Sequence, residues 1–268
     1  MKSKLIALDI DGTILDMPSG FYVPKEVRTA VAEARDAGAR VCLCSSRPCY
    51  MMDDATKDLD EIDALVGCSG AAIEVLSPPA PPTRIYCDIL QQGFVDACVE
   101  IARKWNLYTS FAGDEKIMAR AAWPFDQDLE ENQLFEFLEE AELIKAVQAK
   151  PFSCAFIFAE PGMPEDALYK EPALQEATFH RSGGNCFIIT NKNVDKGTGV
   201  LRLAVHFGIP REAILAVGND ENDIPMLKAA GVGVAVANAS PKTLAAADWI
   251  APDVRHAGAA EAIRRFAL

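Results

Sequence analysis

The chain has 268 residues, half of them hydrophobic and 24% charged, so it can bury one large core or two smaller ones and is not a disordered sequence. Its net charge of −13 argues against nucleic acid and anionic membranes as partners, because both bind basic surfaces. No apolar run approaches the roughly 20 residues of a membrane span, and Asp9 comes too early for a signal peptide, so we expect a cytoplasmic protein.

Eight cysteines stand at positions 42, 44, 49, 68, 87, 98, 154 and 186. In a chain of this size with no visible export signal, we interpret them as reduced thiols rather than as a disulfide framework. Because no CxxC pair occurs, we do not expect a structural zinc site.

The first part of the chain alternates between strand and helix signals. Short apolar runs predict buried strands at residues 4–10, 39–46 and 64–70. Helices are predicted at residues 24–38, with Pro24 near the start and Gly38 past the end, and at residues 51–59. This βαβαβ order predicts a parallel sheet with right-handed connections.

A different pattern begins at residues 77–83, where four prolines predict a stiff, extended linker. The following helix, at residues 88–105, is amphipathic, with an apolar stripe made of Phe94, Val95, Cys98, Val99, Ala102 and Trp105. Further elements are predicted as hairpins at residues 107–121 and 178–190, an acidic helical region at 127–149, a strand at 153–159 and a helix near 164–176. Hairpins pair antiparallel strands, so we expect a separate α+β unit here.

The early alternation returns after the second hairpin. Helices are predicted at residues 196–208, 222–231 and 240–247 and near the C-terminus, and strands at 213–218, 232–237 and 248–252. Ser240 is the expected N-cap of its helix, with Pro241 in the first turn. The simplest fold is therefore α/β: a doubly wound parallel sheet from residues 1–82 and 192–268, with an α+β cap domain inserted at residues 83–191.

Polar residues gather where predicted strands end, which is where open parallel sheets bind ligands. Those that follow strands are Asp9 and Asp11, then Ser45, Ser46 and Arg47, then Asn219, Asp220, Asn222 and Asp223. Lys196 opens a helix, where the helix dipole disfavours a cation, so its placement is informative. We expect all of these side chains to face one crevice.

The chemistry expected of this group is phosphoryl transfer. Oxygen ligands beside a phosphate indicate Mg²⁺, which would keep Asp9 ionised and able to attack phosphorus. Asp11 is close enough to protonate the leaving oxygen and then to accept a proton from water. Ser45 can donate to phosphoryl oxygens and Lys196 can neutralise their charge, while Gly12 allows a sharp turn.

Four motifs in order resemble those of the haloacid dehalogenase superfamily, and of its Cof-type hydrolases with a large α/β cap in particular. They are DIDGT at 9–13, CSSRP at 44–48, VDKGTG at 194–199 and GNDENDIPML at 218–227. The resemblance implies a nucleophile at Asp9, an acid/base at Asp11, and Ser45 and Lys196 on the phosphate.

The resemblance also implies the remaining site residues, and it shows one position at which this chain differs from the family. We expect Gly12, Ser46, Arg47 and Asn222 to help bind the phosphate, and Mg²⁺ to be held by Asp9, Asp11, Asn219 and Asp223. The family usually has an aspartate where this chain has Asn219, so we expect weaker Mg²⁺ binding, with Asp223 or Asp220 supplying anionic support. Ser45 and Ser46 stand where the family shows Thr and Gly.

The sequence therefore predicts a Mg²⁺-dependent phosphatase for a small phosphorylated metabolite, with a sugar phosphate as the leading candidate from the resemblance alone. The alternatives are a phosphomutase of the same superfamily and a non-catalytic phospholigand-binding protein, for which Asn219 would be the first sign of decay. His180 and Arg181 lie on a cap hairpin, where they could contact the substrate, although a plain surface role is the favoured expectation. The sequence leaves the oligomeric state open.

Overall fold

The computed structural model describes residues 2–16, 22–52, 57–59, 62–120, 133–159, 166–183 and 185–268. Its contacts divide the chain into two units. The core unit comprises Met1–Tyr86 and Asp195–Leu268, and the cap unit comprises Cys87–Val194. The two units are described separately below.

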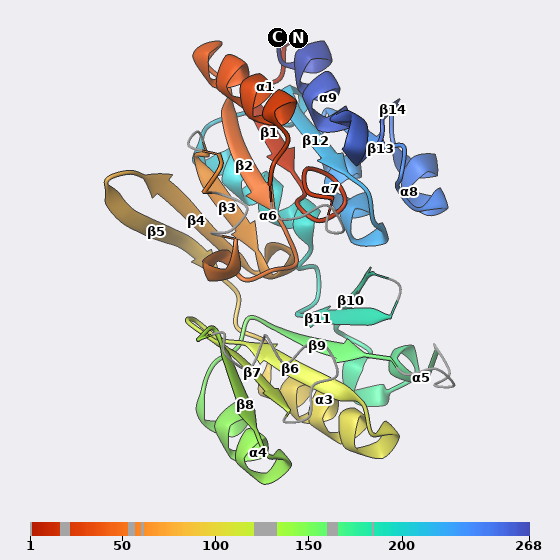
Figure 1. Ribbon diagram of the computed structural model, residues 1–268. Helices are drawn as coiled ribbons and strands as arrows, with labels where there is room; N and C mark the ends of the chain where they lie inside the picture. Colours follow the sequence, from red (N-terminus) through yellow and green to blue (C-terminus); the bar gives the residue numbers. More distant parts are fainter. Residues whose placement is uncertain are drawn as a thin grey trace. The chain divides into compact units, whose positions relative to one another are not determined.

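The core unit is built on an eight-stranded sheet in the order β14-β13-β12-β1-β2-β3-β4-β5 (Figure 1). Its strands are β1 Leu5–Leu8, β2 Arg40–Cys44, β3 Ala64–Gly67, β4 Ala72–Ser77, β5 Ala80–Cys87, β12 Ile214–Gly218, β13 Val232–Val236 and β14 Trp249–Ala251. β1 pairs in parallel with both β2 and β12, and the other pairs from β14 to β3 are also parallel. The direction of winding reverses on either side of β1, which places a topological switch point at its carboxyl end.

Helices cover both faces of this sheet, as a doubly wound fold requires. α1 Lys25–Asp36 and α9 Gly258–Phe266 pack on one face, and α6 Lys196–His206 and α7 Ile224–Ala229 pack on the other. A further helix, α8, spans Pro241–Ala246, and the side chain of Ser240 accepts a hydrogen bond at its start, as expected. The prediction of an α/β fold with a mainly parallel sheet is confirmed.

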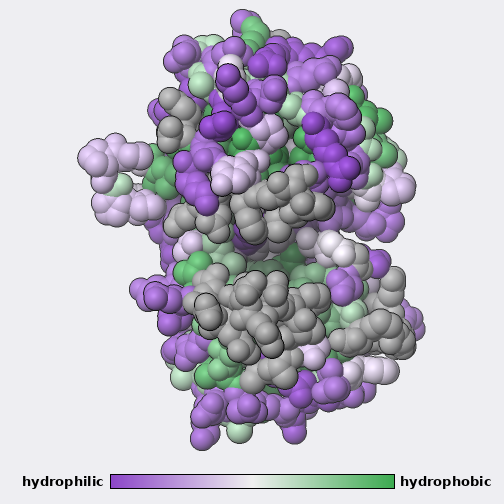
Figure 2. Space-filling model, viewed as in Figure 1, coloured by the Kyte–Doolittle hydropathy of each residue, from purple (hydrophilic) through white to green (hydrophobic). Residues whose placement is uncertain are grey.

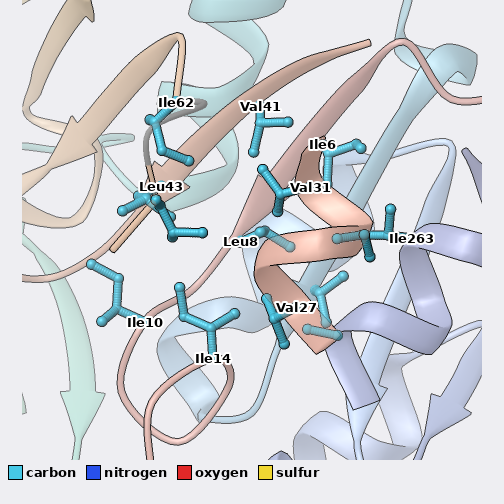
Figure 3. Packing of buried hydrophobic residues seen from close by; sticks show 14 of the residues in the cluster. Ile6, Leu8, Ile10, Ile14, Val27, Val31, Val41, Leu43, Ile62 and Ile263 are labelled. Carbon is cyan, nitrogen blue, oxygen red and sulfur yellow. The ribbon is translucent and has the colours of Figure 1, made fainter. Parts of the chain in front are cut away.

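The β1 sequence shows why two helical layers are needed. Ile6 and Leu8 point into the cluster that α1 and α9 close (Figure 3), whereas Leu5 and Ala7 point into the cluster beneath α6 and α7. Successive strand side chains alternate between faces, so an uninterrupted apolar run must be covered on both sides.

The cap unit has a six-stranded sheet in the order β10-β11-β9-β6-β7-β8. Its elements are α3 Gln92–Trp105, β6 Tyr108–Ala112, β7 Ile117–Arg120, β8 Phe135–Leu138, α4 Glu140–Ala149, β9 Cys154–Phe158, α5 Asp166–Tyr169, β10 Thr178–Ser182 and β11 Cys186–Thr190. Both predicted hairpins are confirmed, because β6 pairs antiparallel with β7 and β10 with β11. Apolar side chains of α3 and α4 form with the strands a core that belongs to this unit alone.

The proline-rich stretch at residues 77–83 is not a linker, and that prediction was wrong. It lies in β4 and β5, which are neighbours at one edge of the core sheet, and β4 runs antiparallel to β3. Figure 1 shows these two strands as the extension at the left of the core unit. Prolines are tolerated there because an edge strand has backbone positions with no hydrogen-bond partner to lose. Residues 83–86 consequently belong to the core unit.

Three helix predictions also need correction. Within 127–149, residues 127–132 lie outside the described residues, and Phe135–Leu138 is a strand before α4 begins at Glu140. The helix expected near 164–176 is reduced to the short α5 and a single 3₁₀ turn at Pro172–Leu174, with 164–165 not described. Of the helix expected at 51–59, the described ends are a 3₁₀ turn at Cys49–Met51 and a turn at 57–58.

The cysteines agree with the expectation of reduced thiols, and Trp105 departs from its expected place. The face shown in Figure 2 is mostly hydrophilic over the described residues. All eight cysteines are free thiols. Trp105, which we placed on the buried stripe of its helix, is 38% exposed because the helix ends at Asn106 directly after it. No helix in the described ranges is both long and apolar enough to cross a membrane.

Candidate active site

A buried lysine joins two carboxylates at the carboxyl ends of β1 and β12. Lys196, the first residue of α6, places its Nζ 2.7 Å from Asp9 Oδ1 and 2.5 Å from Asp223 Oδ1. All three side chains are buried, with Lys196 1% exposed. Lys196 is 187 positions from Asp9 and 27 positions from Asp223 in the chain, yet the three side chains form one charged group, as the strand-end rule predicted.

The electrostatics of this group leave one negative charge in excess. The pKa of Asp9 is raised to about 7: burial raises it most, the carboxylate of Asp223 adds to this, and Lys196 offsets only part of it. For Lys196, burial would lower the pKa, but the carboxylates of Asp223 and Asp9 outweigh it and hold that pKa above its ordinary value. Lys196 therefore stays charged. An added cation or a change of ligand would alter the protonation of Asp9 more than that of Lys196.

The turn after β1 brings a hydroxyl and an amide to Asp9. Thr13 Oγ1 donates to Asp9 Oδ2 at 2.9 Å, a contact that the sequence reasoning missed although Thr13 lies within the DIDGT motif. Gly12 has φ +81°, and a Cβ there would lie 2.4 Å from the side-chain nitrogen of Asn219. The turn consequently needs glycine for both its left-handed backbone and the close approach of Asn219.

The carboxamide of Asn219 lies against three oxygens in a way that fits a magnesium ion. One of its terminal atoms is 2.9 Å from Thr13 Oγ1 and 3.0 Å from both Asp9 Oδ2 and the Asp11 backbone oxygen. Oxygens that share Mg²⁺ at right angles lie about 3 Å apart, because each Mg–O bond is about 2.1 Å long. In the protein by itself these three acceptors favour the amide nitrogen on this side. With the amide oxygen there instead, Asn219 would fit Mg²⁺ together with Asp9 and the Asp11 carbonyl.

This donor set is unusual in charge. Among the residues that the structure describes, no group of three His, Cys, Asp or Glu side chains is arranged to hold a metal ion. The candidate cation site has one carboxylate and two neutral oxygens, and neutral donors attract a divalent cation less strongly than carboxylates do.

Asp223 was expected to bind the metal, but both of its oxygens already accept hydrogen bonds from the protein. Oδ1 accepts from Lys196, and Oδ2 accepts from the backbone N–H groups of Asn219 and Asp220 at 2.8 and 2.9 Å. A Cβ at Gly218 would lie 2.6 Å from Asp223 Cβ, so glycine is needed for this side chain to fold back over the strand end. Asp220 caps the turn through Glu221 N. These contacts give Asp223 the position of a support for Lys196 and the loop.

Asp11 forms a separate ion pair with Arg47. Arg47 Nε lies 2.9 Å from Asp11 Oδ2 and Arg47 Nη2 lies 2.5 Å from Asp11 Oδ1, which is a bidentate arrangement. We had assigned Arg47 to the phosphate, and the structure instead places its guanidinium on the proposed acid/base. The Asp11 side chain is 39% exposed, so it can reach a group that enters from solvent.

The residues that follow β2 form a small hydroxyl cluster with Asn222. Ser45 is buried, and its Oγ accepts from Arg47 N at 3.1 Å. Ser46 Oγ accepts from Asn222 Nδ2 at 2.8 Å and from Ser69 Oγ at 3.3 Å. Within the described part of the chain, the buried Asn222 Oδ1 has no hydrogen-bond partner. The cluster thus retains acceptor and donor capacity for a ligand.

Ser69 is the second contributor that the sequence did not reveal. It has φ +52° and follows Cys68 at φ +50°, and such left-handed conformations are costly for residues other than glycine. The two residues hold the segment that follows β2 in place, because Cys68 N donates to Arg47 O and Ser69 N donates to Ser45 O. The sequence does not predict these hydrogen bonds, because they depend on the conformation of the turn after β3.

The two cap residues that we singled out differ from each other. His180 is buried, and its Nε2 lies 2.9 Å from Thr190 Oγ1 and 3.1 Å from the Val194 oxygen, so the expected surface role was wrong. Arg181 is half-buried, with its guanidinium 5.9 Å from the centre of the Phe187 ring.

A family model described as haloacid dehalogenase-like hydrolase matches residues 6–263. A phosphoglycolate phosphatase of Methanoculleus marisnigri is 28% identical, over 98% of this chain and 96% of its own length. A 5-amino-6-(5-phospho-D-ribitylamino)uracil phosphatase of Bacillus subtilis, YitU, is 25% identical over 88% of this chain and 87% of its own. These matches run through the core and the cap alike.

A solved structure agrees with this in fold. The subclass IIB sugar phosphatase BT4131 superposes with a TM-score of 0.86 over 98% of this chain and 99% of its own. It is 22% identical in sequence, so the likeness establishes the shared fold, which includes both the core sheet and the inserted unit.

Proposed function

The chain belongs to the haloacid dehalogenase-like hydrolase family, and on this premise we propose that it is a Mg²⁺-dependent phosphatase that forms an aspartyl phosphate on Asp9. The family membership, the fold and the phosphatase class agree with the motif resemblance. The metal requirement, the covalent intermediate and the roles of single residues are the parts that we propose.

One observation carries the proposal: Lys196 holds Asp9 and Asp223 together in a buried group at the switch point of the sheet. Two carboxylates and one ammonium group are costly to bury, and a chain that needed only stability would fill this place with apolar side chains. Phosphoryl transfer to an aspartate requires a buried carboxylate that is held in position, a cation site beside it, and hydroxyl groups that can bind the phosphoryl oxygens.

In the proposed reaction, the Asp9 carboxylate attacks phosphorus, the P–O bond to the leaving group breaks, and an aspartyl phosphate forms. Asp11 gives a proton to the departing oxygen and then takes one from the water that attacks the aspartyl phosphate. The P–O bond to Asp9 breaks in this second step, which releases inorganic phosphate and restores both carboxyl groups.

The other side chains stabilise the phosphoryl group and keep the two carboxylates in place. Lys196 neutralises negative charge, and the hydroxyls of Ser45 and Ser46 and the amide of Asn222 bind phosphoryl oxygens. Arg47 fixes the orientation of Asp11 through its bidentate pair. When bound, Mg²⁺ would be held by Asp9, the Asp11 carbonyl and Asn219, and would supply positive charge beside the reacting phosphate.

The proposed substrate is a small phosphorylated metabolite, with the cap unit selecting it. Two relatives of the chain are named phosphatases of phosphoglycolate and of a phosphoribityl compound, and the similar solved structure is named a sugar phosphatase. These names supply the panel to screen: phosphoglycolate, ribityl phosphates, pentose phosphates and hexose phosphates. Sugar phosphates remain our leading class.

The test is hydrolysis of p-nitrophenyl phosphate with and without Mg²⁺. We expect Mg²⁺-dependent phosphate release, reduced about 10³-fold or more by Asp9→Asn, because the variant lacks the nucleophile. Asp36→Asn is the matched control, since this exposed aspartate near the end of α1 lies outside the site, and it should keep full activity.

The same assay separates the alternatives. A phosphomutase would need a sugar bisphosphate to sustain turnover, so phosphate release without any activator argues for the phosphatase. Saturable binding of phosphorylated metabolites without hydrolysis of any of them would instead favour the non-catalytic phospholigand-binding protein and would reject our proposal.

A further inference from the structure

We propose that the turn Cys68–Gly70, which directly follows β3, is a spacer that fixes the position of Lys196 relative to Ser45. The inference rests on the proposed function for what these two side chains bind, and it makes Gly70 a positioning residue of the site. The spacer acts through the backbone of the two segments on which it packs.

The spacer has an unusual backbone. Its three residues have φ of +50°, +52° and +101°, so two residues other than glycine lie in the left-handed region directly before a glycine. Cys68 and Ser69 are both buried, with 2% and 0% of their surface exposed. Such a costly conformation persists only where the surrounding contacts enforce it, and it is found most often at functional sites.

On one side, the spacer is bonded to the segment that follows β2. Cys68 N donates to Arg47 O at 2.9 Å, and Ser69 N donates to Ser45 O at 3.1 Å. In an extended strand successive N–H groups point to opposite sides, so a tight turn is needed for both to reach the same segment. Ser69 Oγ adds a longer contact of 3.3 Å to Ser46 Oγ. The spacer therefore fixes the backbone from Ser45 to Arg47.

On the other side, the spacer touches the start of α6. A Cβ at Gly70 would lie 2.0 Å from the Asp195 oxygen and 3.3 Å from Lys196 N. A Cβ at Gly199, in the first turn of α6, would lie 2.9 Å from Gly70 Cα. Backbone meets backbone at this point, so a change of rotamer cannot absorb a shift between the two segments. The place of the spacer thus sets the place of the first turn of α6.

The two contacts together link the proposed phosphate-binding groups. Ser45 lies on the segment that is bonded to the spacer, and Lys196 is the first residue of the helix that packs on it. A hydroxyl and an ammonium group that act on one phosphoryl group must keep a fixed separation, because electrostatic stabilisation depends on donors that are already in place. The strained turn supplies this separation through the backbone.

The first experiment compares Gly70→Ala with Gly38→Ala. Both glycines have a left-handed backbone, with φ of +101° and +87°, but a Cβ at Gly38 would meet nothing within 4 Å. In Gly70→Ala, the start of α6 must move by about 1 Å to open the 2.0 Å contact to 3.0 Å, the shortest that real Cβ atoms keep.

The measured quantities are kcat and the affinity for orthovanadate, a phosphate analogue, by calorimetric titration in Mg²⁺. In Gly70→Ala, we expect the affinity to fall about tenfold or more and kcat to fall about a hundredfold, because Lys196 is displaced from its place relative to Ser45. Gly38→Ala should change neither by more than about twofold, although backbone strain lowers the Tm of this variant as well.

The second experiment tests whether Gly70 acts through the spacing. Orthovanadate affinity is measured for Ser45→Ala, for Gly70→Ala and for the double variant. The fold-change of the double variant should be smaller than the product of the two single fold-changes, because a misplaced Ser45 hydroxyl contributes little that can still be lost. A substitution that only destabilises the chain would give fold-changes that multiply.

Gly199→Ala replaces Gly70→Ala in both experiments if the latter does not fold. Its Cβ would lie 2.9 Å from Gly70 Cα and 2.6 Å from Val66 Cγ1, so it presses on the spacer from the helix side with a smaller overlap. We expect orthovanadate affinity to fall about threefold or more. Gly93→Ala adds the same methyl group to α3, where it would meet nothing within 4 Å, and should keep the wild-type affinity.

Three results would overturn the spacer. They are wild-type orthovanadate affinity in the folded glycine variant, fold-changes that multiply with those of Ser45→Ala, and a wild-type chain that does not bind orthovanadate. Because this binding needs no turnover, a chain that binds orthovanadate without hydrolysing p-nitrophenyl phosphate would reject the proposed function, and the affinities of the variants would still decide on the spacer.

Discussion

Asp63 is a buried carboxylate with a structural role, and it contrasts with Asp9. It accepts hydrogen bonds from Arg40 Nη1 at 2.7 Å and from Val41 N at 2.8 Å, and it lies 2.9 Å from Arg35 Nη1. Each of these three partners is a hydrogen-bond donor. Such full satisfaction is typical of a carboxylate that stabilises the fold.

We predict that Asp63→Ala lowers the free energy of unfolding by about 3 kcal/mol, because Val41 N and two guanidinium groups lose their acceptor. Urea unfolding measures this, and kcat should stay within twofold of the wild type. Glu100→Ala removes an exposed partner of Arg103 and is the control, with an expected cost below about 1 kcal/mol. An equal cost for both variants would contradict the structural role of Asp63.

Arg47 offers a prediction on catalysis. Arg47→Lys keeps the charge but loses the fork that holds both Asp11 oxygens, so we expect kcat to fall about ten- to a hundredfold through misplacement of the acid/base. If Arg47 only bound the substrate phosphate, KM would rise while kcat stayed near its wild-type value. Steady-state kinetics on p-nitrophenyl phosphate separate these two results.

Part of the site could be foreseen at this scale, and part could not. Asp9, Lys196 and Asp223 come together because parallel strands end on one edge, and that follows from the order of elements. The contact of Thr13 with Asp9 and the pairing of Arg47 with Asp11 depend on side-chain rotamers, which spacing along the chain does not determine.

At the scale of elements, the start of α6 links stability to chemistry. Asp195 is the N-cap: its side chain accepts from Thr198 N at 2.7 Å, and Thr198 Oγ1 accepts from Asp195 N. Lys196 follows directly, so the cap sets the direction from which the lysine reaches Asp9.

We predict that Asp195→Ala costs about 1 kcal/mol of stability and also lowers kcat, because the first turn of α6 loses its cap beside Lys196. Ser240→Ala removes the corresponding cap of α8 and serves as the control, with a similar stability cost and a smaller effect on kcat. Denaturant unfolding and steady-state kinetics on the same preparations give both quantities. Unchanged kcat in Asp195→Ala would show that Lys196 is positioned by its carboxylate partners alone.

The elements that sequence reasoning missed share a physical cause. Four prolines suggested a linker because proline is excluded from the interior of a sheet, yet β5 lies at an edge, and edge position depends on the whole topology. The strand β8 was hidden because it is only four residues long, is half-buried, and lies between acidic stretches that are typical of an exposed helix. The buried strands of the core, in contrast, were foreseen from their apolar runs.

At the scale of the molecule, each unit has a hydrophobic core of its own. Phe111 and Phe152, with ring centres 5.6 Å apart, belong to the core of the cap unit. Ile263 belongs to the core between the sheet of the core unit and its helices α1 and α9. Separate cores allow the units to lose structure separately.

We predict that Phe111→Ala costs about 3–5 kcal/mol and that the loss is confined to the cap unit. Hydrogen exchange should show reduced protection in β6, β9 and β11, while β1, β2 and β12 keep theirs. Ile263→Ala is the matched variant and should give the reverse pattern. Equal loss of protection in both units for either variant would mean that the chain unfolds as one cooperative body.

The central claim is that Asp9 becomes phosphorylated during turnover. It is tested most directly by mixing the chain with p-nitrophenyl phosphate and Mg²⁺, quenching in acid, and analysing the peptides by mass spectrometry. Asp11→Asn should be included, because it slows the second step and allows the intermediate to accumulate. We predict a phosphoryl group on Asp9 itself, absent from Asp9→Asn. Turnover with the phosphoryl group on another residue, or with none on Asp9 at any quench time in either protein, would contradict the account.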